Sequence, residues 1–280
     1  MPHRHRILFV TDLTYAARGR RYCDEDIDLS DRLREHFDVA LCHPVDAAAL
    51  MDAFDVVVIR NSGPVIHYRE AHDDFRARAA AAGVRVFPGL GGKADMAGKQ
   101  YLLDLYAAGY PVIPTADNAS DAAALPGSPW YVAKPTFGAD SVGLQFVGPE
   151  ELAGLAYDDL LVQPRIDFVY EVSFYFVDRT FQYALRAPDP DQRWELAAYE
   201  PTPEDLAFAQ RFVDWNTVDH GVQRVDACRT TTGELLLVEV EDLNPYLSLD
   251  LVEPEARDRF VVDLVASIAA LAAEPVHPPA

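Results

Sequence analysis

Two neighbouring strands rich in apolar residues carry three acidic side chains, and this combination limits what the chain can fold into. Strands are predicted over 222–228 and 235–240, with a glycine-containing turn between them. Alternation along the second strand sends Glu239 and Glu241 to one face, and the hairpin brings Asp226 alongside them. Three carboxylates on one sheet face repel each other strongly unless a cation lies between them. The fold must therefore either supply positive charge at this hairpin or leave it exposed to water.

An acidic hairpin exposed to solvent, with no bound ion, is the simpler alternative. The apolar run that precedes Glu239 favours a more buried setting. Carboxylate oxygens that are too few to complete a cage suit Mg²⁺, which takes its other ligands from water and from the phosphates of a nucleotide. We therefore predict Asp226, Glu239 and Glu241 as metal ligands.

The charge of the chain excludes two classes of partner. The 280 residues carry a formal net charge of −21, which repels nucleic-acid phosphates and anionic membranes. ATP is not excluded, because a few lysines and Mg²⁺ can reverse the potential inside one cleft. No apolar run approaches the length of a bilayer span, so we expect no transmembrane helix.

The cysteine pattern indicates a reducing compartment. Cys23, Cys42 and Cys228 form no Cys-x-x-Cys motif, and two of them lie in predicted strands. The apolar run at 7–10 is too short for the core of a signal peptide. We therefore expect reduced structural thiols and a cytoplasmic protein.

Residues 1–97 alternate strands and helices, which predicts a small parallel sheet flanked by helices. The predicted strands are 6–11, 39–43, 54–60 and 84–87, and the helices are 30–37 and 68–82. Ligands of open α/β sheets bind where the strands end. The segment 60–64, which begins with Arg60, Asn61 and Ser62, falls at such an end.

The rest of the chain is richer in strands, and we divide it into a small lobe at 98–165, a C-terminal lobe at 166–273 and a disordered tail at 274–280. The predicted strands before the acidic hairpin are 130–134, 144–147, 160–163, 172–177 and 180–186. The predicted helices are 100–108, 149–156, 203–214 and 255–272.

A lysine that ends a strand precedes a flexible loop, a pattern that suits phosphate binding. Lys134 is followed by Thr136, Gly138 and Ser141, so an ammonium, hydroxyls and backbone N–H groups can surround phosphate oxygens. An ordinary hairpin turn explains the glycines equally well. Lys99 offers a second positive group, although a lysine taken alone is more often a surface residue.

Two other segments need separate interpretations. Gly92 to Lys99 resembles a phosphate-binding P-loop, but one residue too many separates its glycines and Gln100 replaces the metal-binding Ser or Thr, so we reject that reading. The strand at 160–163 runs into a linker whose backbone can hold an adenine, with Glu171 as a ribose acceptor. By itself this segment is only a strand and a loop.

Taken in order, these motifs resemble the ATP-grasp superfamily. The series runs from Lys99 through Gly-x-Pro-x-x-Pro-Thr at 109–115, Val-x-Lys-Pro at 132–135 and Gln163 with Glu171, to Arg-Val-Asp at 224–226 and the Glu-x-Glu strand. The match spans roughly 99–272, and with the preceding α/β lobe it covers nearly the whole chain. It implies an N-terminal open parallel-sheet lobe followed by a two-lobed ATP-grasp fold, a mixture of α/β and α+β.

The resemblance also implies roles for individual residues. Arg224 and Lys134 would act on the transferring phosphate, and Asp226, Glu239 and Glu241 would bind Mg²⁺. Most members have Asn at the position of Glu241, whereas a Glu-x-Glu pair is similar to the subgroup of cyclo-ligases that form D-cycloserine. The implied nucleotide-binding residues are Lys99, Lys134, Thr136, Gly138, Ser141, Gln163, Pro164, Arg165, Ile166, Glu171 and Arg186. Asn244 is an alternative third metal ligand. Because the N-terminal lobe of the family usually contributes to the acceptor site, the resemblance also implies these candidate substrate residues: Tyr22, Arg60, Asn61 and Ser62, together with Asn244.

The activity implied is an ATP-dependent, ADP-forming ligase. Such an enzyme activates a small carboxylate, an amino acid or peptide, as an acyl phosphate that an amine or an internal nucleophile attacks. A kinase that stops after phosphoryl transfer and a catalytically inactive nucleotide-binding regulatory module are the alternatives. Small-molecule carboxylates and amines are the expected partners, and a homodimer is a further expectation from the family.

Overall fold

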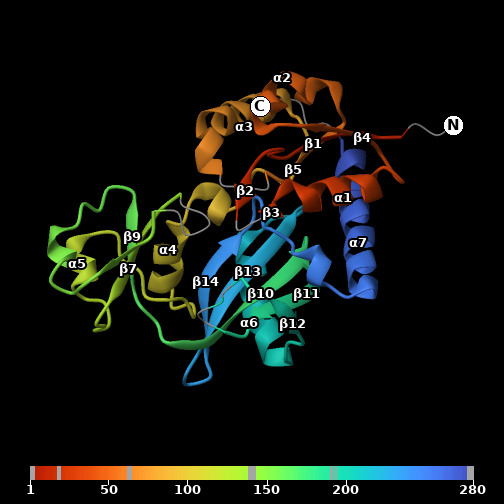
Figure 1. The fold of residues 1–280 in the computed structure, drawn as a ribbon. Coiled ribbons are helices and arrows are strands. Elements are labelled where there is room, and N and C mark those ends of the chain that lie inside the picture. The colour runs from red at the N-terminus through yellow and green to blue at the C-terminus, as the bar shows by residue number, and fades with distance from the viewer. Residues whose placement is uncertain are drawn as a thin grey trace.

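The computed structural model of the chain describes residues 4–17, 20–61, 65–137, 143–189, 192 and 194–275. They form an N-terminal lobe, a small lobe and a C-terminal lobe (Figure 1). In Figure 1 the small lobe stands to one side of the large central sheet, and the N-terminal lobe lies above that sheet. The acidic hairpin, formed by β13 (Val222–Thr230) and β14 (Leu235–Glu241), belongs to this large sheet.

The N-terminal lobe contains a four-stranded parallel sheet of order β4-β1-β5-β6, which confirms the expected fold class of this part. Its strands are β1 (Arg6–Val10), β4 (Asp38–Cys42), β5 (Val56–Ile59) and β6 (Val86–Phe87). Ile7 and Phe9 enter one core while Leu8 and Val10 enter another, because a parallel sheet covered on both faces buries every side chain of its central strand. A short ribbon pairs β2 (Ala16–Ala17) with β3 (Arg20–Arg21).

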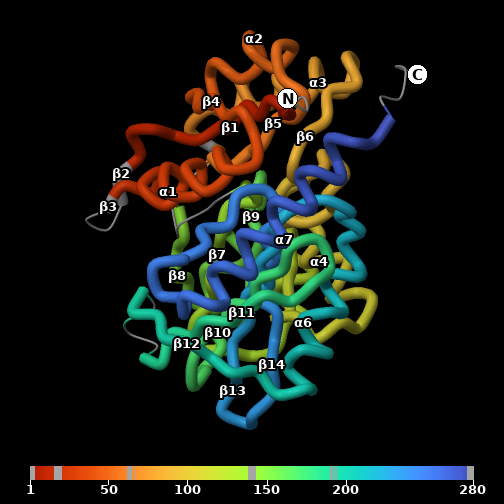
Figure 2. Tube along the Cα trace, turned by 90° about the vertical axis from the view of Figure 1, so that its right-hand side faces the viewer, coloured from red at the N-terminus to blue at the C-terminus, as the bar shows by residue number. Residues whose placement is uncertain are grey.

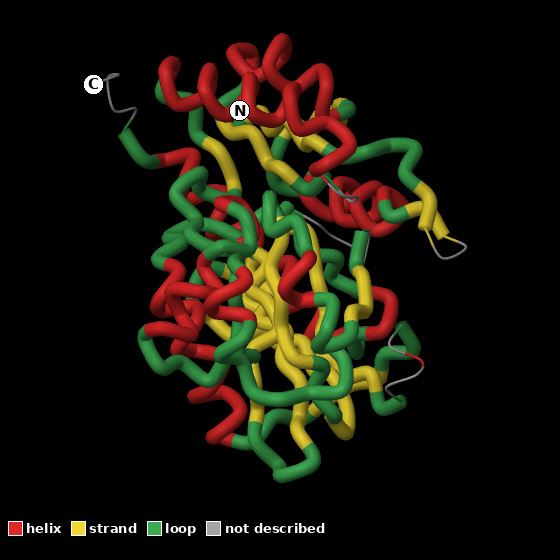
Figure 3. The backbone as a smooth tube through the Cα atoms, turned by 90° about the vertical axis from the view of Figure 1, so that its left-hand side faces the viewer, coloured by secondary structure: helices red, strands yellow, loops and turns green. Residues whose placement is uncertain are grey.

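Helices cover both faces of this sheet, as Figure 3 shows at the top of its view. They are α1 (Cys23–Leu33), α2 (Ala47–Leu50) and α3 (Arg69–Ala82), with 3₁₀ turns η1 (Pro44–Asp46), η2 (Met51–Ala53) and η3 (Val65–Tyr68). Gly83 ends α3 in the left-handed conformation, with φ 66°. The bounds of the helix predicted over 30–37 were wrong, because α1 begins seven residues earlier at Cys23 and ends at Leu33.

The misplaced start of α1 has a physical explanation. Three consecutive acidic residues, Asp24 to Asp26, occupy its first turn, where the positive end of the helix dipole favours them. A run of charges without apolar periodicity suggested a loop. The buried residues Leu29 and Leu33 then fix the face that packs on the sheet.

The small lobe is built on an antiparallel sheet of order β8-β7-β9. Its elements are α5 (Ala119–Ala122), β7 (Tyr131–Pro135), β8 (Gln145–Val147) and β9 (Leu160–Pro164). The helix predicted over 149–156 is absent from this described segment, which forms only the 3₁₀ turn η5 (Leu152–Gly154). Gly154 disfavours helix propagation, and Leu155 is already extended with ψ 141°.

The C-terminal lobe is an antiparallel sheet of order β12-β11-β10-β13-β14. Its strands are β10 (Phe168–Val177), β11 (Thr180–Ala187), β12 (Ala197–Tyr199), β13 (Val222–Thr230) and β14 (Leu235–Glu241). One face packs against α6 (Pro203–Asn216), which starts with a capping box at Thr202, and against α4 (Tyr101–Ala107). In Figure 1 α4 lies between the small lobe and β14, preceded by the turn η4 (Asp95–Ala97).

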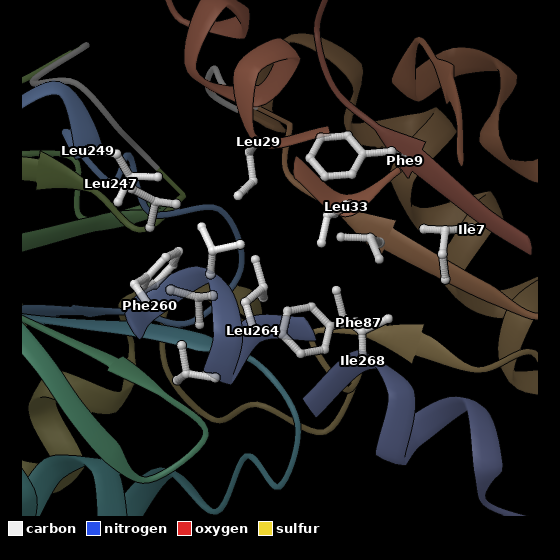
Figure 4. Close-up of a cluster of buried hydrophobic side chains, with 14 of the residues drawn as sticks. Ile7, Phe9, Leu29, Leu33, Phe87, Leu247, Leu249, Phe260, Leu264 and Ile268 are labelled. Carbon is white, nitrogen blue, oxygen red and sulfur yellow. The ribbon is translucent and has the colours of Figure 1, made fainter. Parts of the chain in front are cut away.

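The last helix, α7 (Pro254–Ala273), joins the N-terminal and C-terminal lobes through one hydrophobic core. Figure 2 shows α7 crossing the large sheet and reaching the N-terminal lobe. In the close-up of Figure 4, Phe260, Leu264 and Ile268 lie among side chains from both lobes, with Phe9 on one side and Leu247 on the other. The turn η7 (Leu249–Leu251) precedes the helix. This shared core fixes the N-terminal lobe against the sheet that carries the acidic hairpin.

Within the described ranges, the longest apolar helices fall short of what a membrane crossing requires. Cys23, Cys42 and Cys228 are all buried free thiols. The predicted tail at 274–280 lies mostly outside the described residues.

Because Phe260 is fully buried between two lobes, Phe260→Ala should lower the free energy of unfolding by about 3–5 kcal/mol. Val262→Ala on the same helix is the matched control, since Val262 is 64% exposed and its loss should change stability by less than about 0.5 kcal/mol. Urea titrations followed by circular dichroism measure both. Equal effects of the two substitutions would contradict the shared core.

Candidate active site

A bulge in β14 places the two glutamates of the acidic hairpin on the face opposite the core. Glu239 lies opposite Asp226 and Glu241 opposite Arg224, but Leu237 pairs with Ala227, so Val238 is an extra residue on β14. Strict alternation would have placed Glu239 on the same face as Leu237, which is fully buried. The bulge reverses the side-chain direction between them. Leu237 can therefore fill the core while Glu239 faces away from it.

The three predicted metal ligands come together on this face. One carboxylate oxygen each from Asp226, Glu239 and Glu241 lies within 4.8 Å of the other two. Ser173, on the neighbouring strand β10, donates its hydroxyl to Oδ1 of Asp226 at 2.6 Å and thereby orients that carboxylate. Three half-buried carboxylates that converge in this way are a donor set that fits a hard divalent cation such as Mg²⁺.

Two cationic side chains lie against the cluster. Arg224 contacts Asp226 at 2.8 Å and Glu241 at 2.5 Å, and Lys99 bridges Glu239 and Asp95, the latter at 2.7 Å. Lys99 is itself only 4% exposed, so its ammonium depends on these carboxylates for its partners.

The pKa values of Glu239 and Glu241 show that the nearby cations stabilise the ionised forms of the two carboxylates unequally. Burial raises the pKa of Glu239, but Lys99, Lys134 and Arg224 outweigh it and hold that pKa at about 2. Burial raises the pKa of Glu241 well above its usual range, and the neighbouring Glu239 and Asp226 add to this against the opposing effect of Arg224. The nearby cations therefore do not fully compensate all three carboxylates in their ionised forms, and a bound cation would favour the ionised form of Glu241.

The buried carboxylate of Asp242 holds the segment that carries Asp95 and Lys99 in place. Asp242 accepts the backbone N–H of Ala94 at 3.1 Å and that of Met96 at 2.8 Å. These backbone N–H groups therefore donate to Asp242, whereas those of a P-loop would donate to a phosphate. This agrees with the rejection of a P-loop in this segment. Gly92 packs so closely on this carboxylate that an added Cβ would lie 2.2 Å from Oδ2 of Asp242.

The small lobe turns one face of its sheet toward the large sheet. Lys134 lies opposite Leu161 and Val132 opposite Gln163, so these four side chains share a face of the β7–β9 pair. Leu161 is buried in the core of the large sheet, which shows the direction of this face. Lys134 nevertheless lies near enough to the acidic cluster for its charge to lower the pKa of Glu239.

The predicted adenine linker is partly engaged within the small lobe. Gln163 donates its side-chain amide to the hydroxyl of Thr115 at 2.8 Å, and Pro164 pairs with Tyr131 in the sheet. The backbone N–H of Arg165 donates to the carbonyl of Trp130 at 2.9 Å. The amide of Arg165 is therefore not open to a base, and Ile166 is the next position that offers an N–H.

The predicted loop residues are only partly described. Thr136 is 8% exposed, its N–H donates to Asp159 at 2.9 Å and its carbonyl accepts the N–H of Lys99 at 2.8 Å. This last bond joins the two lysine-bearing segments directly. Gly138 and Ser141 lie outside the described residues.

Two further nucleotide candidates lie on opposite faces of the large sheet. Glu171 precedes Ser173 by two residues on β10, so both lie on the face of the acidic cluster. Arg186 pairs with Val172, whose side chain is buried on the α6 face, and its guanidinium carbon lies 5.4 Å from the centre of the Tyr170 ring. Arg186 therefore lies on the face opposite the acidic cluster. We withdraw its assignment as a phosphate contact.

Arg60, a predicted substrate residue, is a buried anchor instead. It is 3% exposed, pairs with Asp26 at 2.9 Å and donates to the carbonyl of Pro245 at 2.8 Å. Glu25, which also pairs with Arg60, accepts the backbone N–H of Leu247 at 2.8 Å. These contacts hold the segment that follows β14. They keep the guanidinium of Arg60 buried rather than open to a substrate.

The other candidates from the N-terminal lobe contact the same segment. The carbonyl of Asn61 accepts the side-chain amide of Asn244 at 2.8 Å, and Tyr22 stacks on Tyr246 with ring centres 4.9 Å apart. The carbonyl of Tyr246 in turn accepts a hydrogen bond from Arg224 at 3.1 Å. Ser62 lies outside the described residues. The N-terminal lobe thus reaches the cluster through the backbone that follows β14.

Sequence reasoning missed several residues that shape this site. Asp95 could have been found, because it precedes Lys99 by four residues, a spacing at which opposite charges pair. Ser173 and Asp242 lie next to predicted site residues in strand or sequence, but neither belongs to a motif. Glu25 and Tyr246 act through contacts of long sequence separation and left no local signal.

Gly92→Ala should destabilise the protein by about 1–3 kcal/mol, since the new Cβ collides with the carboxylate of Asp242. Gly91→Ala is the matched control, because nothing lies within 4 Å of a Cβ at that position. Thermal unfolding of both variants gives the comparison. A Gly92→Ala protein as stable as the Gly91→Ala protein would show that the segment does not depend on Asp242.

The buried Glu25 predicts a pH dependence of stability. Burial raises its pKa from 4.5 to about 7, so between these values the folded state keeps a proton that the unfolded state has lost. The contribution of Glu25 to the free energy of unfolding therefore falls as the pH rises from about 4.5 to 7. Glu25→Gln should remove this contribution, which urea titrations at pH 5, 6 and 7 would detect as a flatter profile. Glu35→Gln, at an exposed position, should leave the profile unchanged.

Comparisons with known proteins agree with this arrangement at the level of the fold. No protein-family model matches the chain, and no curated protein matches it in sequence. Among solved structures, the D-cycloserine synthetase DcsG is 22% identical, with a TM-score of 0.72 over 93% of this chain and 99% of that one. The D-alanine–D-alanine ligase from Bacillus anthracis is 14% identical, with a TM-score of 0.66 over 97% of this chain and 100% of that one.

A third similar structure is a RiPP-associated ATP-grasp ligase from Chryseobacterium gregarium, in complex with ADP and a leader and core peptide. It is 14% identical, with a TM-score of 0.64 over 97% of this chain and 98% of that one. All three likenesses cover nearly the whole length of both chains. The fold expected from the order of the motifs is therefore confirmed, and the chain has the ATP-grasp fold.

Proposed function

We propose that the protein is an ATP-dependent, ADP-forming ligase that activates a small carboxylate for attack by an amine. The observation that carries this proposal is the convergence of Asp226, Glu239 and Glu241 beside Arg224 and Lys99. An acidic cluster flanked by cations, between two lobes, suits a nucleotide whose phosphates bind both a metal and basic side chains. The similar structures are ligases by name, which supports the same class of reaction.

Asp226, Glu239 and Glu241 would hold Mg²⁺, with Asn244 as the alternative to Glu241. When bound, Mg²⁺ neutralises charge on the β- and γ-phosphates of ATP. Ser173 contributes by fixing the orientation of the Asp226 carboxylate. The side-chain amide of Asn244 donates to Asn61, whereas Glu241 lies within the converging set, so we assign Glu241 as the third ligand.

Lys99, Lys134 and Arg224 would bind the phosphates. Lys99 approaches from the segment between η4 and α4, Lys134 from the small lobe and Arg224 from the large sheet, so the three charges reach the cluster from three parts of the fold. Phosphoryl transfer needs positioning and neutralised charge more than covalent help from the protein. The adenine would lie at 163–166, through the backbone of Ile166, and Glu171 would accept the ribose hydroxyls.

The activated acid would be an acyl phosphate, formed when a substrate carboxylate oxygen attacks the γ-phosphorus and ADP leaves. An amine then displaces phosphate to give the C–N bond. Arg224 would offset the negative charge that develops in both steps. The names of the similar structures include amino-acid and peptide ligases, so we infer an amino acid or a short peptide as the acid. The buried free thiols support our placement of the protein in the cytoplasm.

The reaction can be tested by measuring ADP release from ATP and Mg²⁺ with pairs drawn from a panel of amino acids and dipeptides. A product whose mass equals acid plus amine minus water supports the ligase. A stable phosphorylated substrate without ligation would identify a kinase, and no ATP turnover with any pair would contradict the proposal.

Asp226→Asn should lower ADP release on the order of 100-fold or more, because it removes a charged metal ligand. Its urea midpoint should stay near that of the wild type, since the amide keeps the shape of the side chain. Glu234→Gln, in the exposed turn of the same hairpin, serves as the control and should retain full activity. Full activity of Asp226→Asn would rule out the assigned metal role.

A further inference from the structure

A pocket of about 70 Å³ lies where α3 of the N-terminal lobe meets the nucleotide-binding segments. Its lining includes four residues of α3, together with Asp95 from η4, Thr136 just after β7 and Asn244 from the segment after β14. The α3 residues are Arg69, His72, Asp73 and Arg76. Three of the elements that position the proposed active site therefore also form the walls of this pocket.

His72 brings an unused polar atom to this pocket. The side chain is only 6% exposed, and its Nε2 atom has no hydrogen-bond partner among the residues that the structure describes. A buried polar atom left unpaired costs free energy, so native proteins seldom keep one without a function. Burial and the nearby Arg76 lower the pKa of His72 to about 4. The imidazole is therefore neutral at pH 7 and can present Nε2–H to an acceptor.

Within the described part of the chain, the ion pairs around the pocket leave out one guanidinium, that of Arg76. Asp95 contacts the ammonium of Lys99 at 2.7 Å, and Asp73 lies 3.9 Å from Arg69. The guanidinium of Arg69 also lies over the ring of Phe137, 3.7 Å from its centre. Among the residues that the structure describes, Arg76 makes only a long contact of 3.4 Å to the carbonyl of Met96. The lining carries two guanidiniums and two carboxylates, but Arg76 is the guanidinium outside the described ion pairs. This guanidinium and the neutral N–H donor of His72 together suit a small anion.

We propose that this pocket binds a free carboxylate of a substrate, separate from the carboxylate that is activated. The inference rests on the proposed ligase function. The volume corresponds to about two water molecules at roughly 30 Å³ each, which fits the three heavy atoms of a carboxylate and little more. Asp95 connects the pocket to Lys99 and through it to Glu239, so the rest of such a substrate lies toward the acidic cluster.

This assignment gives the N-terminal lobe a part in selecting the substrate. A molecule with a free carboxylate at one end, such as an amino acid or a peptide, can pair with Arg76 and His72. An ester or a decarboxylated amine cannot, and it would leave both groups unpaired in a buried site. Discrimination that rests on unpaired polar groups is strong, whereas an apolar pocket distinguishes similar substrates only weakly.

The first test uses acetate as the probe and needs no nucleotide. Histidine ring ¹⁵N signals of the wild type are followed at pH 7 during titration with sodium acetate, against sodium chloride at equal ionic strength, and His72→Gln identifies the His72 signal. The expected result is a saturable shift of that signal with acetate alone. A His72 signal that does not respond to acetate would overturn the proposal.

Arg76→Gln supplies an independent variant on the same helix, and Arg78→Gln is its matched control because Arg78 is exposed and pairs with Asp74 at 3.6 Å. Acetate should bind about tenfold more weakly to Arg76→Gln, as expected for the loss of one charge-assisted hydrogen bond of roughly 1.4 kcal/mol, and normally to Arg78→Gln. Equal weakening in both variants would show a nonspecific charge effect and would contradict the pocket.

Enzyme assays separate this inference from the proposed function. In the ADP-release assay, Arg76→Gln should raise the KM of the one substrate that supplies the free carboxylate, acid or amine, and leave the KM of ATP unchanged. ATP turnover without acetate binding at His72 would contradict the anion pocket but leave the proposed ligase function intact. Acetate binding in a protein that never turns over ATP would keep the anion pocket and contradict its role in ligation.

Discussion

Repulsion among the carboxylates of Asp226, Glu239 and Glu241 is the constraint on which the rest of the structure depends. A sheet face that collects three negative charges is stable only if cations approach it. Arg224 supplies one from the same strand pair, and Lys99 supplies the other from the segment before α4. A bulge in β14 makes this compatible with a closed core, because it turns the glutamates outward while neighbouring leucines stay buried. The register of the β13–β14 hairpin therefore determines that the three carboxylates lie together.

The same cluster explains how the lobes are joined. The segment after β14 is held by Arg60 and Glu25 of the N-terminal lobe, and it returns a carbonyl from Tyr246 to Arg224. The segment before α4 is held by Asp242, which directly follows the last glutamate of the cluster. Each cation is therefore positioned by buried hydrogen bonds rather than by exposed ion pairs, which contribute little. A shared core around α7 keeps these contacts in place.

Much of the fold was predictable because its signals are local. The strands β1, β4 and β5, the cap of α6 and the end of α3 at Gly83 follow from hydrophobic patterning and capping residues. The hairpin and its three acids followed from alternation, although the bulge that makes the alternation work did not. Properties set by distant contacts were missed: the burial of Arg60 and the face occupied by Arg186 depend on pairing partners that lie far away in sequence or in another strand.

The central claim, that the acidic cluster binds a metal with a nucleotide, is tested most directly by calorimetry with the non-hydrolysable ATP analogue AMPPNP. The wild type and Glu239→Gln are each titrated with and without Mg²⁺, with Glu234→Gln as the control. The wild type and the control should bind AMPPNP only in the presence of Mg²⁺, and Glu239→Gln should lose this Mg²⁺-dependent binding. Failure of the wild type to bind AMPPNP in the presence of Mg²⁺, or equal binding by Glu239→Gln, would contradict it.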